Sequence, residues 1–292
     1  MATFFGEVVP VYSRAVQEEE EDEDEDEYLE EEDEEDREIK RELQEKRNVV
    51  VSWSPVTLSH IDSSPDKKIS CSHFIAAVGD NPAAFVSSYI LSSGDWEEVG
   101  SIRCWNERCR VSSSTRSVLP HAPSCCTFYR STAKQALVCL CTCYVAEDQM
   151  FQWCEKVFGF LHKSRLKVTV LSTCPVSNYK TTQSTFDLPV PFLKALKTST
   201  YVDKMACGHL EQPNVVDGLP AAVLMHCQEF AIPGVLYHCY TDMAKLDSVT
   251  VEAFCPVLSC PDMSHLAADA AQVKEVLKKV VKEVELQSNL YI

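Results

Sequence analysis

The chain has 292 residues, of which 45% are hydrophobic and 24% charged, and its 44 acidic and 27 basic residues give a net charge of −17. This charge is local, because the stretch from Glu18 to Glu38 holds 18 carboxylates and one arginine, while the remainder carries 26 acidic and 26 basic residues. A neutral folded part excludes a basic nucleic-acid-binding protein, whose Lys and Arg side chains must neutralise phosphates. It also argues against an anionic membrane surface as a partner.

The first 48 residues are expected to form a disordered acidic leader. Like charges repel one another there, and the acidic stretch contains only Tyr28 and Leu29 as apolar side chains. The mixed charges up to Arg47 are compatible with an exposed helix. Residues 49–69 are rich in Ser and contain Pro, which predicts a linker between the leader and the globular region.

The sequence shows no targeting or membrane segment. Its start lacks a basic region, and its apolar residues are interrupted by Glu7 and Pro10, which is unlike a secretory signal. The longest apolar run, 136–146, is about half of what a helix needs to cross a bilayer. The 15 cysteines lie largely in apolar runs, which is typical of reduced, buried residues in an intracellular protein. We therefore expect a soluble, cytoplasmic chain.

From residue 73 onward, strand-like and helix-like segments follow one another. Short apolar runs predict strands at 73–79, 99–105, 125–130, 136–145, 167–173 and 234–240. Amphipathic or Pro-bracketed segments predict helices at 80–94, 146–163, 191–199, 219–233, 248–260 and 267–285. Strands that alternate with helices, and that are apolar enough to be covered on both faces, predict an α/β fold. We expect one layered αβα domain at 70–285, around a central, mostly buried sheet.

Three cysteines recur at every second residue, at Cys139, Cys141 and Cys143. On a strand, this spacing places all three side chains on one face. Zinc sites usually contain matched pairs of cysteines with two to four residues between them. Cys104 with Cys109 and Cys255 with Cys260 have four residues between them, but neither pair has a matched partner. Core packing is therefore favoured, with no metal site and no cofactor expected, while a metal or redox protein stays open as an alternative.

An enzyme has little support in the sequence. The turn from Gly79 to Asn81 places a predicted helix start after a strand, where anions can bind, but it lacks both Gly-rich nucleotide motifs. Neither a GxSxG elbow nor an HExxH motif occurs. His226 and His238 lie in apolar segments, which is typical of core residues. We expect no catalysis, and an α/β enzyme of nucleoside phosphorylase or hydrolase type remains the alternative.

The last residues are expected to form a flexible tail at 286–292. The tail ends in Leu290, Tyr291 and Ile292, so a Tyr ring lies one residue from the terminal carboxylate. The ring can fill a pocket while the carboxylate pairs with a Lys or with backbone amides, which makes these three residues a candidate binding motif. A frayed terminus is the simpler alternative.

Several separate blocks of the sequence are similar to one known family. They are MATFFGEVV, WEEVGSIRCWNERCR, CYVAEDQMFQWCEKVFG, PFLKALKT, LEQPNVVDGLPAAVL, CYTDMAKLDSVTVEAF and LQSNLYI. Over almost its whole length, the chain resembles the proteasome assembly chaperone 1 family. The resemblance implies an α/β layered domain and an ATP-independent chaperone for the proteasome core particle. It also implies a heterodimer with proteasome assembly chaperone 2 that binds the ring of proteasome α-subunits.

The resemblance also implies a role for the end of the chain. The family's docking motif, a hydrophobic residue followed by Tyr and any residue, corresponds to Leu290, Tyr291 and Ile292. In the family this motif enters a pocket between neighbouring α-subunits, where a Lys meets the carboxylate. Neither nucleic acid nor membrane insertion is implied.

Overall fold

The computed structural model describes residues 34–104, 125–182, 184–243 and 245–289. The chain divides into two compact units, residues 1–44 and 45–292. In the first unit, the described part is the beginning of α1 (Glu34–Arg47), whose described side chains are exposed. This agrees with the exposed helix expected from the mixed charges. Residues 1–33, which hold most of the acidic leader, lie outside the described part.

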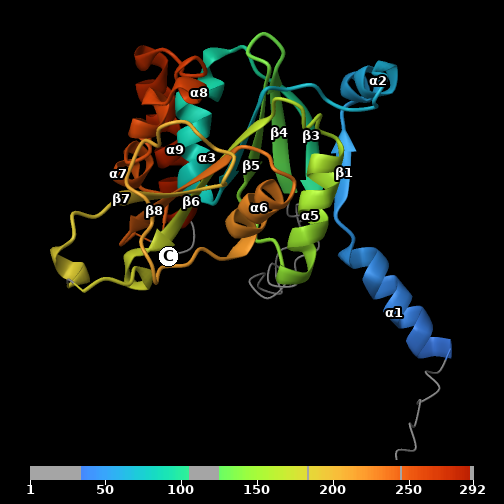
Figure 1. The fold of residues 1–292 in the computed structure, drawn as a ribbon, viewed down its shortest axis with the longest axis horizontal. Coiled ribbons are helices and arrows are strands. Elements are labelled where there is room, and N and C mark those ends of the chain that lie inside the picture. Colours follow the sequence, from blue (N-terminus) through green and yellow to red (C-terminus); the bar gives the residue numbers. More distant parts are fainter. Residues whose placement is uncertain (1–33, 105–124, 183, 244, 290–292) are drawn as a thin grey trace, which may run out of the picture. The chain divides into compact units, whose positions relative to one another are not determined.

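The described part of the second unit is built around one sheet of eight strands, in the order β1-β3-β4-β5-β2-β6-β8-β7 (Figure 1). The central strands β5, β2, β6 and β8 run parallel, and antiparallel strands extend the sheet on both sides. The bounds are β1 (Val50–Trp53), β2 (His73–Val78), β3 (Glu97–Arg103), β4 (Cys125–Ser131), β5 (Ala136–Cys141), β6 (Lys167–Pro175), β7 (Phe192–Lys197) and β8 (Gly234–Thr241).

Helices cover both faces of the sheet (Figure 1). One face carries α5 (Glu147–Gly159) and α6 (Gly218–Glu229), with α2 (Pro55–Ser63) beside β3. The other face carries α3 (Asp80–Tyr89), α7 (Ser248–Glu252), α8 (Pro261–Ser264) and α9 (Ala270–Asn289). The expected layered αβα architecture is confirmed. None of the described helices is long and apolar enough to cross a membrane.

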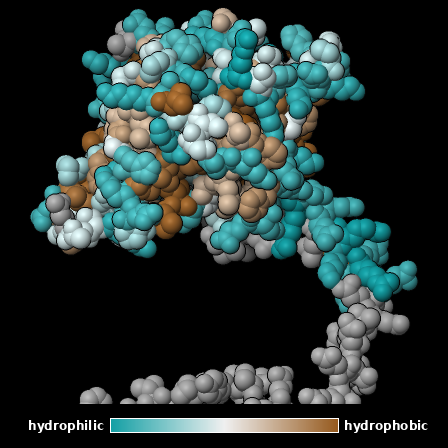
Figure 2. Space-filling view, in the orientation of Figure 1, coloured by the Kyte–Doolittle hydropathy of each residue, from teal (hydrophilic) through white to brown (hydrophobic). Residues whose placement is uncertain are grey.

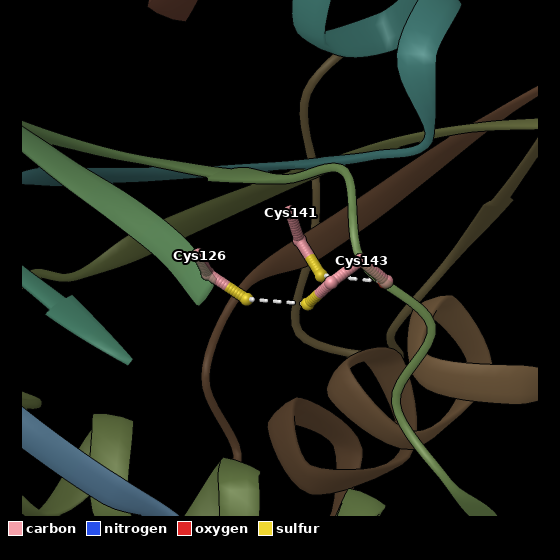
Figure 3. A group of neighbouring side chains, drawn as sticks. All are labelled: Cys126, Cys141 and Cys143. Carbon is pink, nitrogen blue, oxygen red and sulfur yellow. Dashed lines mark hydrogen bonds between the residues drawn. The ribbon is translucent and has the colours of Figure 1, made fainter. Parts of the chain in front are cut away.

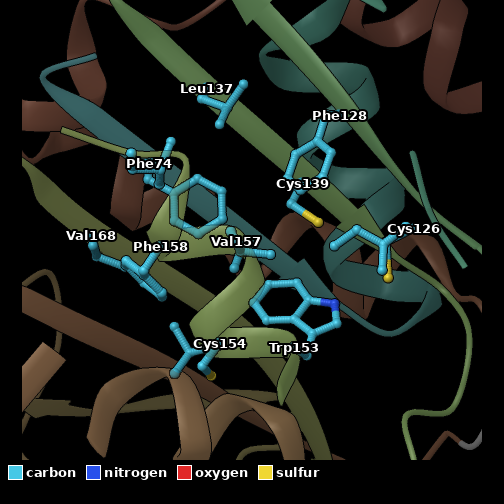
Figure 4. Close-up of a cluster of buried hydrophobic side chains, with 14 of the residues drawn as sticks. Phe74, Cys126, Phe128, Leu137, Cys139, Trp153, Cys154, Val157, Phe158 and Val168 are labelled. Carbon is cyan, nitrogen blue, oxygen red and sulfur yellow. The ribbon is translucent and has the colours of Figure 1, made fainter. Parts of the chain in front are cut away.

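Each face has its own apolar core. Beneath α5 and α6, the ring of Phe74 meets Phe158 edge-on with centroids 5.7 Å apart, and Trp153 is fully buried (Figure 4). On the opposite face, Phe85 stacks on Tyr89 at 4.9 Å. Because β2 alternates residues between the two cores, both of its faces are apolar, which is why its sequence is a continuous apolar run.

Two segments differ from the expectation. Residues 49–69, expected as a linker, contain β1 and α2, and β1 pairs with β3 at the edge of the sheet. Residues 192–197, expected within a helix, form the opposite edge strand β7, which pairs with β8. In both cases a neighbouring strand supplies the backbone hydrogen bonds, and this tertiary pairing outweighs the local pattern.

The C-terminal helices also differ in extent from the expectation. Instead of one helix at 248–260, α7 ends at Glu252 and a 3-10 turn runs over Cys255–Ser259. Pro256 has no N–H to continue the α-helical hydrogen bonds. The last helix, α9, reaches Asn289, so residues 286–289 belong to it and not to the expected tail.

Candidate functional site

The carboxyl ends of the parallel strands are where an open α/β sheet most often binds ligands. At this edge, Gly79 joins β2 to α3 with a φ of +100°, a conformation that favours glycine, and its N–H donates to Cys141 O at 2.8 Å. Gly79 is also the N-cap of α3 and, having no side chain, makes no side-chain capping hydrogen bond. An open pocket of about 210 Å³ lies beside this turn, lined in part by Asn81, Thr173, Thr241 and Asp242.

Two polar residues that line this pocket, Asn81 and Thr241, are hydrogen-bonded within the protein itself. Asn81 Oδ1 accepts from the N–H of Asp247 at 2.9 Å, and Asn81 Nδ2 donates to Lys245 O at 3.4 Å. The hydroxyls of Thr241 and Thr250 share a hydrogen bond of 2.9 Å. These contacts hold the loop that follows β8. Among the described lining residues there is no nucleophile paired with a base, so the pocket offers no support for the enzyme alternative.

Three histidines have a pKa lowered to about 4, chiefly because burial disfavours the charged imidazole. His73 bonds to Asp262 O at 3.0 Å and to Thr169 Oγ1 at 2.9 Å. His226 packs its ring on Phe158 and is half-buried. These two imidazoles are neutral structural groups.

The third histidine forms the arrangement closest to a catalytic pair. His238 Nδ1 lies 2.6 Å from Ser172 Oγ, which joins neighbouring strands β8 and β6. Both residues are buried, with exposures of 5% and 2%. A substrate does not reach this position in the sheet, so the pair is a core hydrogen bond, as expected for His238.

A group of cysteines lies at the same edge of the sheet. The sulfurs of Cys126, Cys141 and Cys143 are all within 4.8 Å of one another (Figure 3). Cys139 is fully buried in the core, as expected, whereas Cys143 is half-buried. The sequence pattern missed Cys126. The register of β4 and β5 pairs Thr127 with Leu140, and one further step places Cys126 opposite Cys141.

The predicted docking residues Leu290, Tyr291 and Ile292 lie outside the described part of the chain. The helix that leads to them is described. Val273 and Leu277 on α9 are buried, and α9 packs against α3. The helix is therefore anchored to the domain through its first half.

Large apolar side chains interrupt the largely hydrophilic surface of the domain (Figure 2). On the helices of one face, Phe151 of α5 is 66% exposed and Met225 of α6 is 63% exposed. Segments between the strands add further examples, including Val202 and Phe186. Single exposed apolar residues are common, but several on one helical layer provide contact area for another protein.

Comparison with known proteins identifies the family. The family model PAC1, described as "Proteasome assembly chaperone 4", matches residues 1–292. The protein named "Proteasome assembly chaperone 1" from Xenopus laevis is 64% identical over 293 residues, covering 100% of both chains. Its human counterpart is 46% identical over 291 residues, covering 99% of both chains. The chain belongs to the proteasome assembly chaperone 1 family.

Solved structures agree on the fold. Pyrococcus furiosus PbaA, an archaeal homolog of proteasome-assembly chaperone, superposes with a TM-score of 0.51 at 11% identity, covering 84% of this chain and 92% of PbaA. Pyrococcus furiosus PbaB, an archaeal proteasome activator, gives 0.51 at 10% identity, covering 84% of this chain and 100% of PbaB. At these identities the likeness concerns the layered fold alone.

Proposed function

We propose that the chain is an ATP-independent chaperone of the cytoplasm that promotes assembly of the proteasome core particle by binding alone. In this proposal it pairs with proteasome assembly chaperone 2, and the heterodimer binds the ring of proteasome α-subunits. The observation that carries the proposal is the full-length similarity to proteins named for this role, at 64% identity in one relative. Exposed apolar side chains such as Phe151 and Met225 are compatible with a protein that works through surface contacts.

The second part of the proposal concerns Leu290, Tyr291 and Ile292 as the residues that dock between α-subunits. Support comes from the helix before them. From buried Leu277 to Asn289 there are 12 residues, which extend about 18 Å along a helix axis. Because the helix is anchored to the domain, the point from which the last three residues extend is fixed. This reduces the conformational entropy that these residues lose on docking.

A tail of three residues binds weakly by itself, with an affinity of roughly micromolar to millimolar. Tight binding therefore requires additional contacts from the folded surface or a second tail from the partner. Either source raises the effective concentration of the tail at its pocket. The proposal thus combines a domain surface that sets position with a C-terminal motif that enters a pocket.

Isolation of the chain from cells tests the first part. A sequence-related partner chain and proteasome α-subunits, without mature β-subunits, are expected to co-purify with it. Recovery of the chain alone, or with fully assembled proteasomes only, would contradict the proposed role in early assembly.

Substitution at the end of the chain tests the second part. Tyr291→Ala removes the ring from its pocket and should weaken binding to purified α-rings about tenfold to a hundredfold. Additional residues after Ile292 should have a similar effect, because they displace the carboxylate from its cationic partner. Ser288→Ala, on the same terminal segment, is the matched control and should bind normally. All variants should unfold at the temperature of the original chain. Unchanged binding of both altered tails would exclude the docking role.

A further inference from the structure

The cysteine group at the carboxyl end of β5 has the arrangement of a metal site. Cys126 comes from the beginning of β4, Cys141 ends β5, and Cys143 lies at the bend that follows. This bend returns the chain toward β5, so Cys141 Sγ donates to Cys143 O at 3.5 Å. The three sulfurs point toward one another (Figure 3). Two strands and a bend therefore bring together side chains that are up to 17 residues apart in sequence.

The separation of two of the three sulfurs fits a shared cation. Cys126 Sγ and Cys143 Sγ are 3.7 Å apart. A disulfide requires about 2.05 Å between its sulfurs, so these two are not bonded. Two thiolates about 2.3 Å from one zinc ion, at a tetrahedral angle, lie about 3.8 Å apart. The observed separation therefore requires almost no movement for both sulfurs to bind one metal.

Trp153 supplies a second, independent observation. Its side chain is fully buried, and its Nε1–H has no hydrogen-bond partner within the described part of the chain. The nitrogen lies on the side of the indole that faces Cys126 (Figure 4). A buried N–H without an acceptor is costly, whereas an N–H directed at a metal-bound thiolate stabilises it.

We propose that Cys126, Cys141 and Cys143 bind one Zn²⁺ ion as three thiolates, with water in the fourth position. The thiolate ligands are soft donors suited to a cation with a filled d shell. Cys143 is half-buried, so solvent reaches the group from its side and can supply the water. Binding replaces three S–H protons, which pass to solvent, and leaves the zinc with its three thiolates at a net charge of −1. The ion joins β4, β5 and the segment that enters α5.

Titration of the purified full chain tests the proposal. The protein is reduced, stripped with a chelator and titrated with ZnCl₂ against a competing chromophoric chelator, and proton release is recorded in parallel. We expect one zinc per chain with nanomolar affinity, release of about three protons near or below neutral pH, and a higher thermal midpoint. Co²⁺ in place of zinc should give the strong near-ultraviolet absorption of thiolate-to-cobalt charge transfer.

The variants make the test specific. Cys126→Ser and Cys143→Ser should each weaken zinc binding at least a hundredfold and reduce the cobalt absorption. Cys207→Ser is the control, because Cys207 is also half-buried but lies in the loop after β7. Cys143 is only half-buried, so its replacement by Ser keeps the test valid even if Cys126→Ser fails to fold.

Three outcomes would overturn the proposal. The first is no zinc uptake by the reduced chain. The second is uptake that Cys143→Ser leaves unchanged. The third is stoichiometric binding of Cu⁺, supplied as its acetonitrile complex, without binding of Zn²⁺, which would assign the three thiolates to copper.

Discussion

The centre of the sheet and its two edges are stabilised in different ways. All eight residues of β8 are buried, and the strand is covered by an apolar core on each face. Of the four residues of β1, only Trp53 is buried, and β7 buries only Ala195. The centre is thus held by burial of both faces, whereas each edge depends on a few anchoring contacts. Substitutions in the central strands should therefore lower the stability of the whole domain. Substitutions in an edge strand should lower it only where they remove an anchoring contact.

The largest expected effect comes from deleting the β1 edge. Trp53 is 8% exposed and stacks on Phe128 with ring centroids 4.8 Å apart, and Val49 is 2% exposed. A chain that lacks residues 1–54 loses both side chains together with the pairing to β3. Its free energy of unfolding should fall by about 4 kcal/mol or more, measured by urea denaturation.

A shorter deletion is the control for this prediction. Removing residues 1–44 takes away only the first compact unit and leaves Val49 and β1 in place. Its free energy of unfolding should change by less than about 0.5 kcal/mol. If the shorter deletion destabilises as much as the longer one, the first unit packs on the domain and β1 is not the anchor of this edge.

A matched pair of leucines compares the centre with the other edge. Leu236 of β8 is fully buried, and its register partner Leu196 of β7 is half-buried against the same core. Leu236→Ala should cost about 3 kcal/mol of unfolding free energy, because it leaves a cavity, and Leu196→Ala about 1 kcal/mol. Equal losses in chemical denaturation would show that the β7 edge is packed as firmly as the centre.

The same contrast explains what the sequence predicts. The central strands are continuous apolar runs because both of their faces are buried, and β2, β5, β6 and β8 were all predicted. The edges carry no such pattern. In β7, Phe192, Leu193, Ala195 and Leu196 recur with helical spacing, and only pairing with β8 makes this segment a strand. In β1, four residues are too few for an alternating pattern to be recognised.

The candidate sites also differ in how much of each can be predicted from the sequence. The alternation of Cys139, Cys141 and Cys143 predicts that these residues share one face of a strand, but Cys126 joins the group only through the register of β4 with β5. A ligand from a neighbouring strand has no local signature. The place of Tyr291 next to the last residue and the family resemblance predict a docking role for it, and this role stays a prediction.

Acid should weaken the centre of the sheet through two buried histidines. His73 in β2 and His238 in β8 have a pKa lowered to about 4 by burial, whereas in the unfolded chain they take up a proton near pH 6.5. Below about pH 6.5 the unfolded state binds more protons, so stability is present above this pH and falls progressively toward pH 4. We expect a loss of about 1 to 2 kcal/mol per histidine between pH 7 and pH 5, measured by denaturation at each pH.

His238→Gln provides the control for the acid effect. Gln cannot take up a proton, and its side chain can still bond to Ser172. The variant should lose less stability than the original chain between pH 7 and pH 5, by roughly the share of one histidine. An unchanged pH dependence would mean that acid acts on another part of the molecule.

The smallest expected effect belongs to the polar contact at the β7 edge. Lys194 of β7 forms an ion pair with Glu211, which also accepts a hydrogen bond from the Tyr179 hydroxyl at 3.0 Å. The Lys194 side chain is 19% exposed, but that of Glu211 is 57% exposed, so water and salt screen the pair. Lys194→Met retains the packing of the aliphatic stem, and Glu211→Gln retains an acceptor for Tyr179. In a double-mutant cycle the two changes should couple by about 0.5 kcal/mol at low salt, and by less at 1 M salt. A coupling above about 2 kcal/mol that persists at high salt would place this edge in the same class as the buried centre, where removing one side chain leaves its partner unsatisfied.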